Sequence, residues 1–151
     1  YLANPREQNG VSTTRGGTAS ATAIKYKTNT MSVADQYLIR GGVNYNLKNF
    51  AITAGVRMEC VPSEDLIGGS NGFRRPGYVI AAEPTISYQI KSLNIFAAVP
   101  FALERNRVQS YSDKLRSADT GTKVVGDAAF ADYSVSVGIS YRFSNKMHVR
   151  M

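Results

Sequence analysis

Apolar and polar residues alternate along five stretches of the chain with a period of two, which is typical of β-strands with one apolar face. The predicted strands cover residues 33–47, 50–59, 78–90, 93–103 and 131–143. Weaker alternation near Ala19–Lys27 indicates at most a poor sixth strand. The pattern predicts an all-β protein of antiparallel strands, because short polar turns join successive strands as hairpins.

The connections between the predicted strands alternate in length. Two tight turns lie at Lys48-Asn49 and Lys91-Ser92, and three long polar or glycine-rich segments cover residues 1–32, 61–77 and 104–130. We expect residues 1–32 to be an irregular segment or loop, residues 33–143 to hold the strands, and residues 144–151 to form a C-terminal tail.

Two prolines fall inside predicted strands. Pro84 lies within the third strand and Pro100 within the fourth. Proline has no backbone N–H to donate to a sheet, so we expect a bulge or local irregularity at these positions.

Three of the strands carry two tyrosines on one face, eight or ten residues apart. Eight residues of a tilted strand rise on the order of 20 Å, close to the roughly 25 Å apolar band of an outer-membrane barrel. Aromatic residues at both edges of such a band lie at the lipid–water interfaces. The predicted aromatic girdle consists of Tyr37, Tyr45, Phe50, Tyr78, Tyr88, Tyr133, Tyr141 and Phe143.

These features predict an antiparallel up-and-down transmembrane β-barrel with short periplasmic turns and long extracellular loops at 1–32, 61–77 and 104–130. Five or six strands are too few, because about eight is the minimum for a closed transmembrane barrel. We therefore expect this chain to be part of a larger barrel, completed by missing N-terminal strands or by other subunits. Its first residue, Tyr1, and the absence of a signal peptide favour truncation.

The last predicted strand has the sequence DYSVSVGISYRF, residues 132–143. It resembles the closing strand of bacterial outer-membrane β-barrel proteins of the porin and transporter type, which alternates in the same way and ends in an aromatic residue. Tyr141 and Phe143 match the aromatic positions of the signal that the barrel-assembly machinery recognises. The resemblance implies a location in the outer membrane of Gram-negative bacteria, contact with the bilayer and lipopolysaccharide, and passive passage of small solutes.

Four charged residues lie on the polar faces of the strands: Arg40, Arg57, Glu59 and Glu83. A charge facing lipid at mid-membrane costs roughly 2–4 kcal/mol, so in a barrel these residues face the lumen. They predict either a charged constriction that selects solutes or a salt-bridge network that fills a narrow barrel. The sequence leaves both readings open, because strand number sets the width of the lumen.

Arg74 and Arg75 lie in the glycine-rich segment Gly68–Gly77. The segment lacks the GxxxxGK[ST] spacing of a phosphate-binding loop, and no predicted helix follows it, so a surface loop with glycine turns is the main prediction. The two arginines remain candidates for contact with a ligand or a lipopolysaccharide phosphate.

Composition excludes several other functions. Mean hydropathy is −0.22. The sequence contains no run of 18 apolar residues, so it predicts no transmembrane helix. The net charge of +7 is scattered over the loops, without the basic stripe that a nucleic-acid-binding protein needs. Cys60 and His148 are the only residues of their kinds, so we expect no disulfide, metal site, catalytic triad, enzyme activity or cofactor.

Two alternative functions remain. A soluble β-barrel or sandwich with the apolar faces turned inward would bind an apolar ligand. A structural or adhesion barrel in the outer membrane would carry no transport at all.

Overall fold

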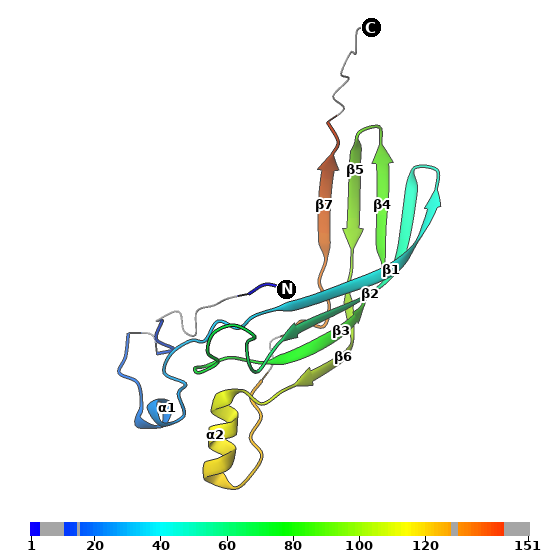
Figure 1. The fold of residues 1–151 in the computed structure, drawn as a ribbon. Coiled ribbons are helices and arrows are strands. Elements are labelled where there is room, and N and C mark those ends of the chain that lie inside the picture. Colours follow the sequence, from blue (N-terminus) through cyan, green and yellow to red (C-terminus); the bar gives the residue numbers. More distant parts are fainter. Residues whose placement is uncertain (4–10, 15, 128–129, 144–151) are drawn as a thin grey trace. The chain divides into compact units, whose positions relative to one another are not determined.

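The computed structural model describes residues 1–3, 11–14, 16–127 and 130–143 (Figure 1). Within them, antiparallel strands predominate and two helices are short. The elements in chain order are α1 (Ala21–Lys25), β1 (Tyr37–Leu47), β2 (Phe50–Val61), β3 (Gly77–Ala82), β4 (Thr85–Ile90), β5 (Leu93–Ala98), β6 (Phe101–Arg107), α2 (Tyr111–Thr120) and β7 (Ser136–Tyr141). The predicted tail at 144–151 lies outside the described residues.

The seven strands are the five predicted strands, two of which are interrupted at proline. Glu83-Pro84 separates β3 from β4, and Val99-Pro100 separates β5 from β6. The Val99 amide donates a hydrogen bond of 3.1 Å to the Pro84 carbonyl oxygen, so the two interruptions lie beside each other. The expected irregularities at Pro84 and Pro100 are confirmed.

The strands form one open sheet. Its order is β6-β3-β2-β4-β5-β7, with β1 paired to β2. The β2–β4, β4–β5 and β5–β7 pairs are antiparallel. When β3 with β4 and β5 with β6 are each counted as one interrupted strand, each strand pairs with the next one along the chain. An all-β, antiparallel fold is confirmed, while the described strands do not close into a barrel.

Both predicted tight turns are two-residue hairpin loops. Lys48 has a φ of 52° and Lys91 a φ of 51°, the left-handed conformation that favoured hairpin turns require. The Gln89 side-chain amide donates to the Lys91 carbonyl oxygen at 2.6 Å. The Asn49 side-chain amide donates to the Gln89 carbonyl oxygen at 3.1 Å. Side-chain hydrogen bonds thus support turns that contain no glycine.

The chain divides into two compact units. Unit 1 comprises residues 1–39, 58–80 and 103–131, and unit 2 comprises residues 40–57, 81–102 and 132–151. Unit 1 contains both helices and most of the long connections. Unit 2 contains both tight turns, β4, β5 and β7.

The long connections of unit 1 contain helices that the alternation pattern did not predict. The weak strand expected at Ala19–Lys27 is wrong, because this stretch forms α1 with Ser20 as its N-cap. Within the connection expected at 104–130, β6 continues to Arg107 and α2 follows. Ser110 caps α2 through a capping box with Asp113.

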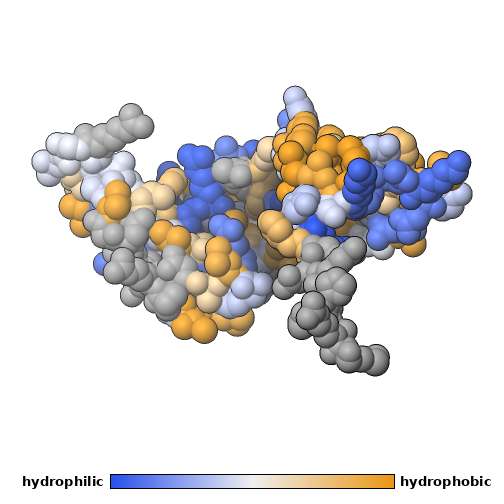
Figure 2. All heavy atoms as spheres, turned by 90° about the horizontal axis from the view of Figure 1, so that it is seen from above, coloured by the Kyte–Doolittle hydropathy of each residue, from blue (hydrophilic) through white to orange (hydrophobic). Residues whose placement is uncertain are grey.

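Among the described residues, the interior is more polar than apolar. The buried hydrophobic residues are Val79, Ala81 and Ala98. The buried polar or charged residues are Ser32, Asp35, Arg74, Glu83, Ser110, Ser112 and Asp113. Figure 2 shows hydrophobic side chains gathered at the surface instead.

The apolar strand faces of unit 2 are exposed. Val43 is 75% exposed, Val137 71% and Ile139 69%. Along the first half of β2, apolar residues such as Ile52 and Val56 are exposed, and the intervening residues are half-buried. Ordinary soluble sheets have the opposite distribution, with the apolar face buried.

Candidate functional site

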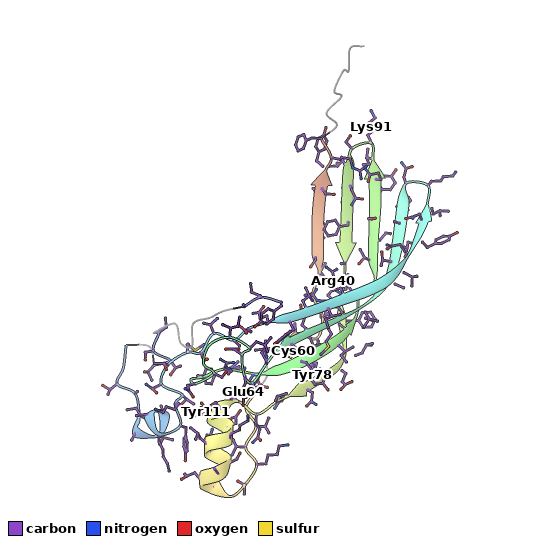
Figure 3. All side chains as sticks on the ribbon, in the orientation of Figure 1. Arg40, Cys60, Glu64, Tyr78, Lys91 and Tyr111 are labelled. Atoms are coloured by element: carbon purple, nitrogen blue, oxygen red, sulfur yellow. The ribbon has the colours of Figure 1, made fainter. Side chains whose placement is uncertain are left out.

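Three charged residues meet on the polar face of unit 2, and we call them the arginine–glutamate cluster: Arg40 in β1, Arg57 in β2 and Glu83 after β3. Arg40 donates to both carboxylate oxygens of Glu83, with an Nε–Oε2 distance of 2.9 Å and an Nη2–Oε1 distance of 2.5 Å. The Nη1 atom of Arg57 lies 3.8 Å from Glu83 Oε1. Figure 3 labels Arg40 on its strand.

The three side chains differ in exposure. The Glu83 side chain is 5% exposed, Arg57 is 24% exposed and Arg40 is 54% exposed. The Glu83 amide donates to the Gly55 carbonyl oxygen at 2.8 Å, which fixes the backbone beneath the carboxylate. Two guanidinium groups approach one buried carboxylate, and the most exposed of the three side chains is Arg40.

A hollow of about 210 Å³ lies beside the cluster. Its lining consists of Arg40, Gly41, Gly42, Asn44, Thr53, Gly55, Glu83 and Thr85. Gly42 allows β1 and β2 to approach closely here, since a Cβ at this position would lie 2.7 Å from the Ala54 carbonyl oxygen. The Thr53 hydroxyl donates to Oδ1 of Asn44, which adds neutral polar groups to the lining.

Glu59, the fourth charged residue predicted to face a lumen, lies in unit 1. It lines a cavity of about 490 Å³ together with Tyr1, Tyr37, half-buried Cys60 and Phe130. The structure therefore brings together Arg40, Arg57 and Glu83 from the predicted set.

Four of the predicted girdle residues form two contacting pairs near the tight turns of unit 2. Phe50 and Tyr88 are cross-strand partners with ring centroids 4.4 Å apart. The rings of Tyr141 and Phe143 lie 4.9 Å apart, edge to face.

Tyr45 in β1 and Tyr133 before β7 also belong to unit 2, and they are 67% and 68% exposed.

The two remaining girdle residues, Tyr37 and Tyr78, lie in unit 1. Tyr37 contacts the ring of Tyr1, with centroids 4.9 Å apart. Tyr78 donates to Glu104 Oε1 at 2.9 Å.

The structure corrects the prediction for Arg74. Its side chain is 1% exposed and makes two hydrogen bonds, of 2.9 and 2.8 Å, to the fully buried carboxylate of Asp65. It also donates to the Ser32 hydroxyl at 2.6 Å. Arg74 thus holds the connection 61–77 together and is not placed to bind a surface ligand. Arg75 is exposed, with its guanidinium 5.6 Å from the centroid of the Phe73 ring.

Asp35 and Asp65 are structurally important residues that the alternation pattern did not reveal. Asp35 is completely buried, accepts a hydrogen bond from the Tyr1 hydroxyl, and accepts another from the Leu66 amide at 3.3 Å. Its own amide donates to Asp65 Oδ1 at 2.9 Å. No periodic signal marks these positions, since aspartate in a polar connection ordinarily indicates a turn.

In the described part of the chain, no group of three or more His, Cys, Asp or Glu residues is arranged to hold a metal ion. No helix in that part has the length and apolar character needed to cross a membrane. His148 lies outside the described residues. No protein-family model, curated protein or solved structure matches the chain.

Proposed function

We propose that this chain forms part of the wall of an outer-membrane β-barrel, acting as a passive pore or transporter for small solutes. The observation that carries the proposal is the inverted side-chain distribution of unit 2. Val43, Val137 and Ile139 are about 70% exposed, whereas the Glu83 carboxylate is buried. A contiguous exposed apolar face is unfavourable in water and favourable against lipid.

The two faces of the sheet then have different surroundings. Lipid contacts the apolar face, and the aromatic residues near the tight turns, such as Tyr45 and Tyr141, lie at the lipid–water interface. The arginine–glutamate cluster lies on the opposite face, where water in the lumen solvates the exposed part of Arg40. The long connections of unit 1 lie outside the cell, and Arg75 is the candidate there for contact with a lipopolysaccharide phosphate.

The proposed barrel needs further strands beside β1 and β7. Among the described residues of unit 2, each of these strands pairs on one side only, and an unpaired backbone edge in lipid costs several kcal/mol per group. Successive strands are antiparallel across the five-strand order β1-β2-β4-β5-β7, so β1 and β7 run in the same direction. If a second copy of the chain lay beside β7, its β1 would therefore run parallel to β7. An all-antiparallel barrel requires an odd number of additional strands, from another segment or a different subunit.

Single-tryptophan variants test the lipid-facing assignment, because this 151-residue sequence contains no tryptophan. Val137 and Ser136 are neighbours on opposite faces of β7. In the full-length gene product reconstituted into vesicles, brominated lipid should quench the added fluorescence of Val137→Trp and leave that of Ser136→Trp nearly unchanged. Equal quenching at the two positions would contradict the proposal.

Fractionation of cell envelopes separates the proposal from its soluble alternative. We expect the native protein in the detergent-extracted outer-membrane fraction, with gel mobility that changes on heating. Recovery in the soluble fraction without detergent would support a β domain that binds an apolar ligand. The same exposed apolar residues favour this second candidate if they pack inward in the complete protein.

Conductance separates a pore from a structural or adhesion barrel. The full-length protein should produce ion currents across a planar lipid bilayer, with no requirement for an energy source. An outer-membrane protein that inserts without producing current would support the structural or adhesion function.

A further inference from the structure

We propose that the strand beside the outer edge of β1 is supplied by the residues that immediately precede Tyr1 in the full-length gene product. This inference rests on the proposed function, which requires a further strand at that edge and leaves its source open. It assigns one occupant, a segment of the same polypeptide, and one register. The residues that carry it all belong to unit 1.

The backbone of Leu2 pairs with the residue that comes directly before β1. The Leu2 amide donates to the Gln36 carbonyl oxygen at 2.9 Å, and the Gln36 amide donates to the Leu2 carbonyl oxygen at 3.0 Å. Two residues that exchange both bonds form a hydrogen-bonded pair of an antiparallel ladder. Figure 1 shows the N-terminus beside the start of β1. The first residues of the chain therefore run antiparallel to β1.

This pairing uses the edge of β1 that points away from β2. Residues 48 and 49 form a two-residue hairpin turn, so Leu47 and Phe50 direct their backbone N–H and C=O groups toward each other. Along a strand, these groups point to alternate sides from one residue to the next. The odd-numbered residues of β1 thus face β2, and Gln36 faces the opposite side. A strand that continues the pairing of Leu2 lies along the outer edge of β1.

Side-chain contacts define the register of this pairing. When Leu2 lies opposite Gln36, Tyr1 lies opposite Tyr37, and the two rings are in contact, with centroids 4.9 Å apart. Such an aromatic pair stabilises neighbouring strands. Counting on in the same register, the residue immediately before Tyr1 meets Leu38, and the second residue before Tyr1 meets Ile39.

The same polypeptide suits this edge better than a second copy. A strand from another subunit would have to end where Leu2 already occupies the edge, whereas the residues before Tyr1 continue the existing ladder without a break. Their direction also meets the requirement of the proposed barrel. The added strand is antiparallel to β1, and β1 and β7 run in the same direction, so it is antiparallel to β7 as well.

The amino-acid sequence encoded directly before Tyr1 provides the first test. Tyr37 and Ile39 lie on the apolar face, and Ile39 is 67% exposed. In the register above, the second, fourth, sixth and eighth residues before Tyr1 share this face and should be apolar, with polar or small residues between them. A membrane-spanning strand needs about 9–11 residues. An upstream sequence that is shorter, or that lacks this alternation, overturns the inference.

Cysteine cross-linking tests the register in the full-length protein, embedded in outer-membrane vesicles. Serine first replaces Cys60, the only cysteine of this sequence, and any cysteine outside it. A cysteine at the second residue before Tyr1 is then combined with Ile39→Cys. These positions form a non-hydrogen-bonded pair, in which side chains are closest and a disulfide fits. Oxidation with copper phenanthroline should close a loop within one polypeptide, which migrates faster in a denaturing gel until dithiothreitol is added.

Two further pairs serve as controls. Leu38→Cys, combined with the same upstream cysteine, places the two thiols on opposite faces of the sheet and should not cross-link. Tyr1→Cys combined with Tyr37→Cys should cross-link, because the two rings are in contact. If this pair fails, the alignment does not exist in the full-length protein and the inference is wrong. If it succeeds and the Ile39→Cys pair does not, the chain leaves the edge of β1 before Tyr1, which also overturns the inference.

The remaining outcomes separate the source of the strand from the proposed function. A cross-link between two polypeptides, seen as a dimer, assigns the edge of β1 to a second copy and overturns the inference. An absent Ile39→Cys cross-link with lipid quenching of Val137→Trp overturns the strand and leaves the lipid-facing wall standing. An intramolecular cross-link in a protein that is recovered without detergent supports the strand and contradicts the outer-membrane function.

Discussion

The ring of Phe96 lies over Gly138 on the neighbouring strand. The two residues are direct partners in the antiparallel β5–β7 pair. A Cβ at position 138 would lie 2.2 Å from Phe96 Cζ and 2.5 Å from Cε1. The missing side chain of Gly138 therefore creates the space that the aromatic ring fills, an arrangement that compensates for glycine in a strand.

Gly138→Ala should destabilise the protein by about 1–3 kcal/mol, because the Phe96 ring must leave its position or the strands must separate. The free energy of unfolding in urea, measured in detergent or lipid vesicles, checks this value. Gly41→Ala is the control, since nothing lies within 4 Å of a Cβ built at that position. Equal stability of the two variants would contradict the contact.

Asp65→Ala should be among the most destabilising substitutions in unit 1. It leaves the Arg74 guanidinium, 1% exposed, without its carboxylate partner. Breaking a buried ion pair in this way costs about 3–5 kcal/mol, because an uncompensated charge remains in the interior. The same urea measurement should show the loss, and limited proteolysis should show faster cleavage within residues 61–77.

The neighbouring Glu64 supplies the control for Asp65. Its ion pair with Lys114 is shorter, at 2.6 Å, but the two side chains are 66% and 50% exposed. Solvent screens such a pair, so Glu64→Ala should change stability little. If both variants lose the same stability, burial is not the reason for the strength of the Asp65–Arg74 pair.

The strands were predictable because period-two alternation is a local signal. Tyr133 to Phe143 alternates almost without a break, and Pro84 and Pro100 mark the two interruptions directly. Closure was not predictable, because whether β7 meets another strand depends on long-range pairing that alternation does not encode.

The helix α2 was missed although its end signals are present. Ser110 and Asp113 form a capping box, and Gly121 ends the helix with a φ of 69°. Between these ends, Leu115 is one of few apolar residues, so no apolar stripe reveals a helical period. End signals alone identify helices poorly in a polar segment.

The candidate site was partly predictable. Arg40 and Arg57 are equally distant from the tight turn at 48–49, so the hairpin register brings them opposite each other. The position of Glu83 depends on the pairing of the next strand at a proline interruption, which the sequence does not determine. Burial of Arg74 depends on Ser32 and Asp65, contacts that alternation cannot reveal.

Ser110→Ala should weaken α2 by about 1 kcal/mol, because the N-cap hydroxyl that accepts from the Asp113 amide is lost. The same substitution removes the Ser110 hydroxyl bond to the Asp113 carboxylate. Amide hydrogen exchange across the first turn of α2 should become faster. Ser110→Thr keeps a hydroxyl and should retain most of the protection, whereas equal exchange in both variants would exclude capping as the cause.

Tyr1 should titrate well above an ordinary tyrosine. Its hydroxyl donates to Asp35, and this hydrogen bond, together with partial desolvation of the phenol and the negative charge of Asp35, raises the pKa of Tyr1 to about 12. In the unfolded chain, the phenol has a pKa of about 10. Since the folded pKa is the higher one, the linked stability is fully present below pH 10 and is lost as pH rises toward 12.

Phenolate absorbance checks this expectation. The difference between the wild type and Tyr1→Phe isolates one tyrosine, and its midpoint should lie near pH 12. Asp35→Asn replaces the charged carboxylate with a neutral amide, so the pKa of Tyr1 should fall toward its usual value. Asp127 is exposed, and the control Asp127→Asn should leave the pKa of Tyr1 unchanged. A wild-type midpoint near 10, the value of a free phenol, would show that Tyr1 and Asp35 are not hydrogen-bonded in solution.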